Sequence, residues 1–157
     1  MKLRELLSRL RQDREGAMVI ETALVAPVLV LMSLGAYQVS GIVARQSELQ
    51  SAAAEAGAIA LASPPDTIAK RTVLKNVVMA SSGLPANKVT VSVVYRCDAQ
   101  TSFSNSATSC GTSGFVSSFV RIQLQDTYTP QWTRFGVGQP ITYNVVRYVM
   151  IGQAEAH

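Results

Sequence analysis

A glycine and a glutamate near the start of the chain are spaced for a two-step chemistry. Gly16 ends a charged stretch, and Glu21 lies five residues beyond it, inside a long apolar run. Cleavage after Gly16 would create an amine on Ala17, and on a helix residues four apart share one face. The amine of one subunit and the Glu21 carboxylate of its neighbour would then neutralise each other when helices bundle.

Glu21 needs an explanation because an ionised side chain in a membrane helix costs about 2.5 kcal/mol or more. Two other interpretations stay open beside cleavage. The carboxylate could reach the membrane interface, since it lies only seven residues after Arg14, or it could pair with a cation on another membrane helix. A charged group inside such a segment is in each case a functional hypothesis by default.

Two cysteines could form a covalent link. Cys97 and Cys110 flank one polar loop, and a disulfide between them is permitted if this part of the chain is exported. Closing such a loop would stabilise the fold by roughly 3 kcal/mol. Two unrelated free thiols are the alternative. A zinc site is not expected, because two cysteines lack further ligands and the single histidine, His157, is the last residue.

The sequence shows no pattern typical of an enzyme. His157 is poorly placed to complete a serine–histidine–acid triad, and the acidic residues form no obvious pair. Residues 136–138 read Gly-Val-Gly but are followed by Gln-Pro, so they predict a turn rather than a phosphate loop. Trp132 and Phe135 beside this turn are either a surface contact or the edge of a core. We expect no metal and no cofactor.

The elements that would position these residues begin with one long helix, predicted over residues 17–62. Residues 17–43 contain a single charge and would span about 40 Å as a helix, enough to cross a bilayer of about 30 Å. Pro27 should kink this segment near Ala23. Farther along, apolar residues recur on one face that should pack against another element: Leu49, Ala52, Ala53, Ala56, Ile59 and Ala60.

Residues 63–157 predict a folded α+β domain. A second helix is expected over residues 66–82, capped by Asp66 or Thr67 and ended by Gly83 and Pro85. Its predicted apolar face consists of Ala69, Val73, Val77 and Ala80. Period-two patterns over residues 88–96, 115–125 and 141–151 predict three strands. Because sequential strands usually pair, the simplest architecture is a three-stranded antiparallel sheet covered by the helices.

The charge distribution indicates a membrane topology. The formal net charge is +4, but five of the fourteen basic residues lie within the first fifteen positions. No basic stripe is interleaved with aromatic residues, so nucleic acid is not an expected partner. A basic start before an apolar run stays on the cytoplasmic side. We therefore expect residues 1–16 to be a cytoplasmic leader, residues 17–43 to be an anchor in membrane lipids, and residues 63–157 to lie outside.

The opening segment also resembles a known family. RQDREGAMVIETALVAPVLVLM followed by ARQSELQSAAAEAGAIALA resembles the class III signal of type IV pilin-like proteins. More narrowly, it is similar to the TadE-like family of minor pilins, or pseudopilins, of the tight-adherence (Tad/Flp) pilus system. Residues 19–27 and 45–58 carry the resemblance, and DTYTPQW with PITYNVVRYVMIG resembles the family's closing strands less specifically.

This resemblance implies cleavage between Gly16 and Ala17 by a prepilin peptidase. Glu21 would take the place of the family's glutamate, which processing or assembly needs. Thr22 departs from the aromatic residue usual in the Tad group, whereas Ala17 departs from the phenylalanine of type IVa pilins and type II secretion pseudopilins and so favours the Tad group. A pilin-like domain of roughly 95 residues suits a minor subunit rather than a major Flp pilin.

The implied partners are the peptidase, the other major and minor pilins of the system and the inner-membrane assembly platform. The implied location is the bacterial inner membrane, as a single-pass protein until extraction into the pilus, with a role in assembly and surface adherence. Two alternatives stay open. One is an uncleaved, signal-anchored periplasmic or surface binding protein that uses the loop 101–109 or Trp132. The other is a type II secretion pseudopilin.

Overall fold

The computed structural model describes residues 14–98, 100–111, 114–136 and 138–155. The chain divides into two compact units, residues 1–41 and residues 42–157, and the division falls inside helix α2 (Arg14–Ala62). The leader predicted over residues 1–16 therefore lies mostly outside the described residues, and α2 begins three residues before the predicted start at Ala17.

In the first unit, α2 carries large apolar side chains that are exposed. From Met18 to Leu34 these side chains are 46% to 70% exposed. By length and composition the helix can cross a membrane, with a mean hydropathy of 2.0. This confirms the predicted apolar helix. The helix continues through Pro27 as one element, and the kink near Ala23 stays a prediction.

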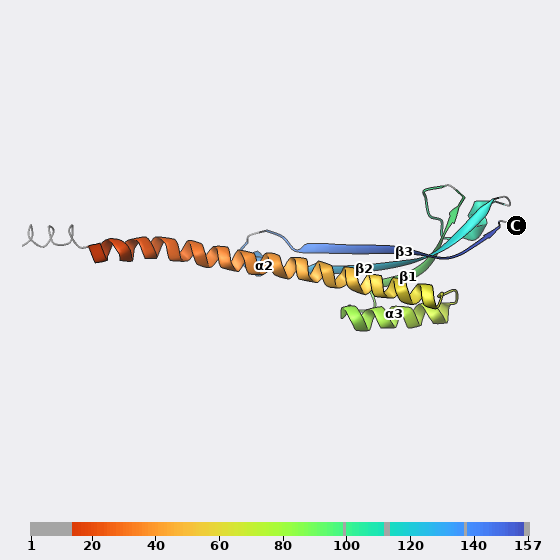
Figure 1. Cartoon of the computed structure of the whole chain (residues 1–157), viewed down its shortest axis with the longest axis horizontal. Helices are drawn as coiled ribbons and strands as arrows, with labels where there is room; N and C mark the ends of the chain where they lie inside the picture. Colours follow the sequence, from red (N-terminus) through yellow and green to blue (C-terminus); the bar gives the residue numbers. More distant parts are fainter. Residues whose placement is uncertain (1–13, 99, 112–113, 137, 156–157) are drawn as a thin grey trace, which may run out of the picture. The chain divides into compact units, whose positions relative to one another are not determined.

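The second unit is built on a three-stranded antiparallel sheet (Figure 1). Strands β1 (Val89–Cys97), β2 (Phe115–Tyr128) and β3 (Ile141–Glu155) lie in that order. Val120 pairs with Val93 on one side and Val149 on the other. The predicted strands and the α+β class are confirmed, and β2 and β3 extend a few residues beyond their predicted ends.

Residues 42–62 of α2 cover one face of this sheet with small side chains. Leu49, Ala53, Ala56 and Ala60 are buried in the core with Val120, Ile122, Leu124 and Val149. At Gly57 α2 approaches the side chains of β3 closely, because a Cβ there would lie 3.1 Å from Arg147 Nε and 3.2 Å from Val149 Cγ2. The predicted alanine-rich face therefore packs as expected, and its small size sets the distance between helix and sheet.

Helix α3 (Ile68–Ser82) lies beside this part of α2 (Figure 1). The Thr67 hydroxyl accepts a hydrogen bond from the Lys70 N–H at 3.3 Å, and Gly83 ends the helix with a left-handed φ of 67°. Both predicted ends are confirmed. Gly83 suits this position because a residue without Cβ adopts positive φ readily.

The predicted packing face of α3 is wrong. Ala69, Val73, Val77 and Ala80 are exposed, and the buried residues are Leu74, Val78 and Ser82. The buried set follows from the turn after the helix. The Ser82 hydroxyl donates to the Val78 carbonyl at 2.6 Å, and Leu84, which follows Gly83, is itself buried in the core. The turn is therefore consistent with packing of the Leu74 face of the helix in the core.

Candidate functional site

The residues predicted to take part in processing lie together in the first turns of α2. Gly16, Ala17, Glu21 and Thr22 are all helical, and Gly16 and Glu21 are exposed. The Thr22 hydroxyl donates to the Met18 carbonyl at 2.8 Å, so this side chain folds back on its own helix. Because a helix repeats every 3.6 residues, positions 17 and 21 lie about one turn apart, and the cleavage and the amine–carboxylate pairing stay predictions.

Glu21 also borders a shallow hollow on the helix surface. The hollow has a volume of about 250 Å³ and is lined by Glu21, Thr22, Val25, Ala26 and Leu29. These residues are one turn apart along two adjacent rows, and the small Ala26 lies between larger neighbours. Such a hollow fits a side chain from a second helix, since ridges of one helix pack into grooves of another.

A protease would meet the Gly16–Ala17 bond inside the helix. The structure places both residues within α2, which begins at Arg14. Peptide groups inside a helix are hydrogen-bonded and coiled, whereas a terminal turn of a helix opens at a low free-energy cost. Cleavage would therefore require this first turn to open.

The predicted disulfide is present. Cys97 and Cys110 are bonded, with their Cα atoms 5.1 Å apart, at the end of β1 and in the short helix η1 (Ala107–Cys110). The loop that they close returns to β1, where Tyr95 and Ser104 exchange two backbone hydrogen bonds of 2.7 Å. The disulfide therefore anchors a loop that protects the outer edge of β1.

The same loop places an aromatic side chain on the sheet face opposite α2. Phe103 stacks on Tyr148 with ring centroids 4.3 Å apart and meets Phe119 edge-on at 5.3 Å. The Arg96 guanidinium lies 5.0 Å from the Phe119 ring centroid. The polar composition of residues 101–109 predicts a surface loop able to bind a ligand, but it does not indicate that Phe103 holds the loop against the sheet.

Trp132 and Phe135 lie in the short helix η2 (Gln131–Phe135), after the end of β2. Trp132 is half-buried, and a Cβ at Gly138 would lie 3.2 Å from its indole Nε1, so the ring packs on the following turn. The Phe135 side chain lies outside the described residues. The disulfide loop precedes β2 and η2 follows it, so these two predicted regions lie at opposite ends of one strand and do not form a common site.

An ion-pair junction at Arg45 was not predicted. Its Nε donates to Asp126 Oδ2 at 2.6 Å, and its Nη1 donates to Glu48 Oε2 at 2.8 Å and to the Ser82 carbonyl at 3.2 Å. Burial lowers the pKa of the Arg45 guanidinium, but the bonds to Glu48 and Asp126 outweigh it and hold that pKa above its usual value. Arg45 therefore joins α2 to β2 and to the end of α3.

Only part of the Arg45 junction left a signal in the sequence. Glu48 follows at i+3, the spacing of a helical ion pair, but Asp126 lies 81 residues away and nothing in the local pattern indicates it. Within the described residues, no three histidine, cysteine or acidic side chains are grouped as metal ligands would be.

Residues 16–58 match the family model of the TadE-like proteins. In the structure this whole segment lies within α2 and includes Gly16, Glu21, Arg45 and Gly57. The resemblance seen in the sequence is therefore confirmed over these residues, whereas α3 and the sheet lie outside the matched segment. Neither a curated protein nor a solved structure matches the chain.

Proposed function

We propose that this chain, whose residues 16–58 match the TadE-like family model, is a minor pilin of a Tad-type pilus, cleaved by a prepilin peptidase between Gly16 and Ala17. The observation that carries the proposal is an apolar helix exposed on all sides with one carboxylate, Glu21, four residues from the proposed new N-terminus. Surrounded by lipid, that carboxylate is costly. Between bundled helices it would have a partner, the Ala17 amine of a neighbour.

The partners follow from the same proposal. The exposed segment 18–34 would first lie in the lipid of the bacterial inner membrane and then pack with the helices of major and minor pilins. Residues 63–157 would stay outside the membrane. The peptidase and the inner-membrane assembly platform would act on the chain in sequence, and the assembled pilus would support surface adherence.

The direct test is the mass of the N-terminal peptide. Mass spectrometry of the full chain from cells with an active prepilin peptidase should find Ala17 at the N-terminus. Cells that lack the peptidase should yield the intact leader. An intact leader in both strains would contradict the processing step.

A second test separates assembly from anchoring. Glu21→Ala should abolish incorporation into pili and leave the folding of residues 42–157 unchanged, because Glu21 belongs to the other unit. Ser33→Ala is a matched control, since Ser33 is a polar residue of the same segment whose hydroxyl donates only within its own helix, to the Leu29 carbonyl at 2.9 Å. Normal assembly of the Glu21 variant would exclude the amine–carboxylate pairing.

Two alternatives make different predictions. An uncleaved anchored binding protein would keep its leader, and it would lose adhesion when Trp132 or the loop 101–109 is altered rather than when Glu21 is. A type II secretion pseudopilin would be cleaved in the same way, but its loss would abolish secretion of exported proteins instead of piliation. Comparing piliation with secretion in a deletion strain distinguishes these machines.

A further inference from the structure

The two edge strands of the sheet, β1 and β3, differ in how far their outer edges are covered. The outer edge of β1 is covered where Ser104 pairs with Tyr95. The outer edge of β3 has no strand or bridge beside it within the described residues. β3 is nonetheless 15 residues long, has no proline, and before its last residue carries one charge, Arg147. Proteins usually protect long edges with charges, prolines, bulges or covering loops. In β3 the bulge lies at Ile151 and the charge at Arg147, so residues 141–146 are a stretch of this edge that is open for pairing.

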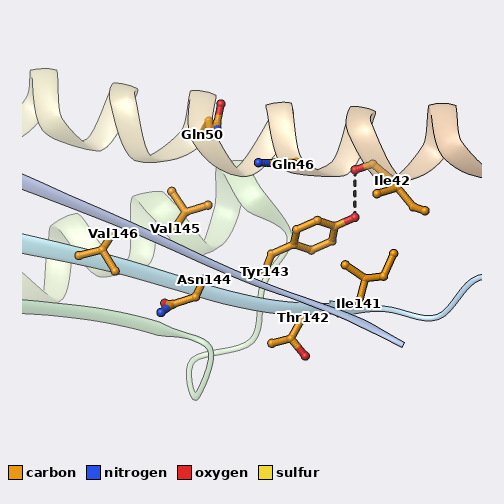
Figure 2. A pocket seen from close by; sticks show the side chains of 9 residues that line it. All are labelled: Ile42, Gln46, Gln50, Ile141, Thr142, Tyr143, Asn144, Val145 and Val146. Atoms are coloured by element: carbon orange, nitrogen blue, oxygen red, sulfur yellow. Dashed lines mark hydrogen bonds between the residues drawn. The ribbon is translucent and has the colours of Figure 1, made fainter. Parts of the chain in front are cut away.

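A groove runs along this open edge. It has a volume of about 510 Å³ and lies between β3 and α2 (Figure 2). Its β3 side consists of six consecutive residues, 141–146. Side chains of a strand alternate between two faces, so a groove over one face would be lined by every second residue. Lining by consecutive residues places this groove beside the backbone itself.

The α2 side of the groove is formed by Ile42, Gln46 and Gln50. Figure 2 shows Gln46 between α2 and β3, next to Tyr143, whose hydroxyl donates to the Ile42 carbonyl at 2.9 Å. Carboxamide groups both donate and accept hydrogen bonds. The helix therefore presents groups that can bond the N–H and C=O groups of a backbone lying in the groove.

These features define the chemistry of the occupant. A row of strand N–H and C=O groups is matched by another extended backbone, as in β-strand addition. None of the nine residues that line the groove is charged, which does not suit nucleic acid or an anionic lipid headgroup. Ile141, Val145 and Val146 offer apolar contacts to alternate side chains of the occupant. An uncharged, extended peptide segment fits best.

We infer that the outer edge of β3, at residues 141–146, accepts an extended uncharged segment of another pilus subunit as a fourth strand. The identity of the partner as a pilus subunit rests on the proposed function, whereas the strand pairing does not. A second copy of this chain fits less well. In a symmetric antiparallel β3–β3 pair, residues 42–62 of the two copies would run in opposite directions. The proposed membrane segments that precede them would then point away from each other and could not enter one membrane from the same side.

Amide hydrogen exchange of the full chain tests the pairing. It is measured in membranes and pili from producing cells, and on the purified chain in detergent micelles and in vesicles of phosphatidylethanolamine and phosphatidylglycerol. Because every second N–H of an edge strand points away from the strand it already pairs with, the outward-facing amides among residues 141–146 should exchange at least tenfold more slowly in the cellular samples than in either purified sample. Equal exchange in all samples would overturn the inference. Slow exchange in the synthetic vesicles, which contain no other subunit, would assign the protection to lipid. That result would also overturn the inference.

A matched pair of charge variants locates the contact. Gln46→Lys adds a charge to the groove, whereas Ser51→Lys adds one to an exposed position of the same helix that does not line it. Only Gln46→Lys should remove the slow exchange of residues 141–146. If both variants retain the slow exchange, or both lose it, the groove is not the contact.

A photoreactive residue at position 50 identifies the occupant. The crosslinked peptide should come from one segment of a different subunit, and the adduct should disappear in the Gln46→Lys background. An adduct with a second copy or with lipid would overturn the inference. Cleavage after Gly16 is read in the same samples. An uncleaved chain with slow exchange at 141–146 would reject the pilin proposal alone, whereas a cleaved chain with fast exchange there would reject the fourth strand alone.

Discussion

The two halves of α2 use one secondary structure in opposite ways. Leu29, in the first half, is 57% exposed, whereas Leu49, in the second half, is completely buried. The first half carries large apolar side chains on every face, and the second carries a stripe of small ones on a single face. The partners of the second half therefore lie within the chain, whereas under the proposed function those of the first half are lipid and the helices of other pilins.

This difference has an energetic reason. Burial of a leucine or valine from water stabilises a protein by about 1.5–3 kcal/mol, so the second half contributes to the fold of its own chain. In lipid this driving force is lost, because hydrocarbon tails are as apolar as the side chains, and helices associate through close packing and polar groups. Glu21 and the hollow beside it supply both of these features in the first half.

The largest contrast should come from leucine truncation in the two halves. Leu49→Ala should lower the free energy of unfolding of the second unit by about 2–5 kcal/mol, because it leaves a cavity in the core. Leu29→Ala should change it by less than about 0.5 kcal/mol, as surface substitutions do. Urea denaturation of the full chain in micelles, followed by Trp132 fluorescence, measures both. Equal losses would mean that the two halves do not differ in their partners.

How far the sequence predicts this molecule depends on how local each signal is. The apolar run, the alanine stripe, the Thr67 and Gly83 caps and the period-two strands are all local patterns, and the structure confirms them. The prediction of which face of α3 is buried was wrong because the helix carries two apolar stripes. Periodicity cannot choose between Val73 and Leu74, and the choice is made by the turn that leads to Leu84.

Long-range contacts limited the prediction of the site in the same way. The disulfide was predictable because two cysteines allow a single pairing within the chain. The Arg45–Asp126 bond, the stacking of Phe103 on Tyr148 and the open edge of β3 depend on which distant residues meet, and only the folded chain determines this. The roles of Gly16 and Glu21 stay predictions from the sequence, because their proposed partners lie outside the chain.

Removal of the disulfide should destabilise the second unit and leave the first unit unchanged. Replacement of both Cys97 and Cys110 by serine should lower the free energy of unfolding of the second unit by roughly 3 kcal/mol, the value for a loop of this size. Helicity of an isolated peptide of residues 14–41 in micelles provides the baseline for the first unit. The wild-type chain treated with reductant should match the double variant. A loss of helicity attributable to residues 14–41 would contradict the separation of the two units.

Glycine enlargement gives a matched test of helix surroundings. Gly57→Leu should destabilise the second unit by about 1–3 kcal/mol, because Arg147 and Val149 occupy the space that the side chain needs. Gly35→Leu meets no atom within 4 Å and should raise helix stability by up to about 1 kcal/mol, the usual penalty of a helical glycine. Thermal unfolding by circular dichroism should therefore show shifts of opposite sign. Shifts of the same sign would show that Gly35 is also enclosed.

The smallest expected effect concerns the hydrogen bond at the first residue of the second unit. Tyr143→Phe removes the bond from its hydroxyl to the Ile42 carbonyl and should cost about 1 kcal/mol. Burial, with nearby Tyr128 and Asp126, raises the pKa of Tyr143 above the usual value of a tyrosine, about 10. The folded state thus holds this proton more tightly than the unfolded state, and the stabilisation is full below about pH 10 and lost as the pH rises through the folded-state pKa.

The Tyr143→Phe variant should therefore lose this alkaline part of the stability curve as well as the bond. Tyr148→Phe is the control, because that side chain is 42% exposed on the opposite face and keeps its ring stacked on Phe103. Urea denaturation between pH 7 and pH 11 should give curves for the wild type and the control that fall more steeply above pH 10 than the Tyr143→Phe curve. Parallel curves would show that the Tyr143 proton is held no more tightly after folding, and that residue 42 is not fastened to β3 through this hydroxyl.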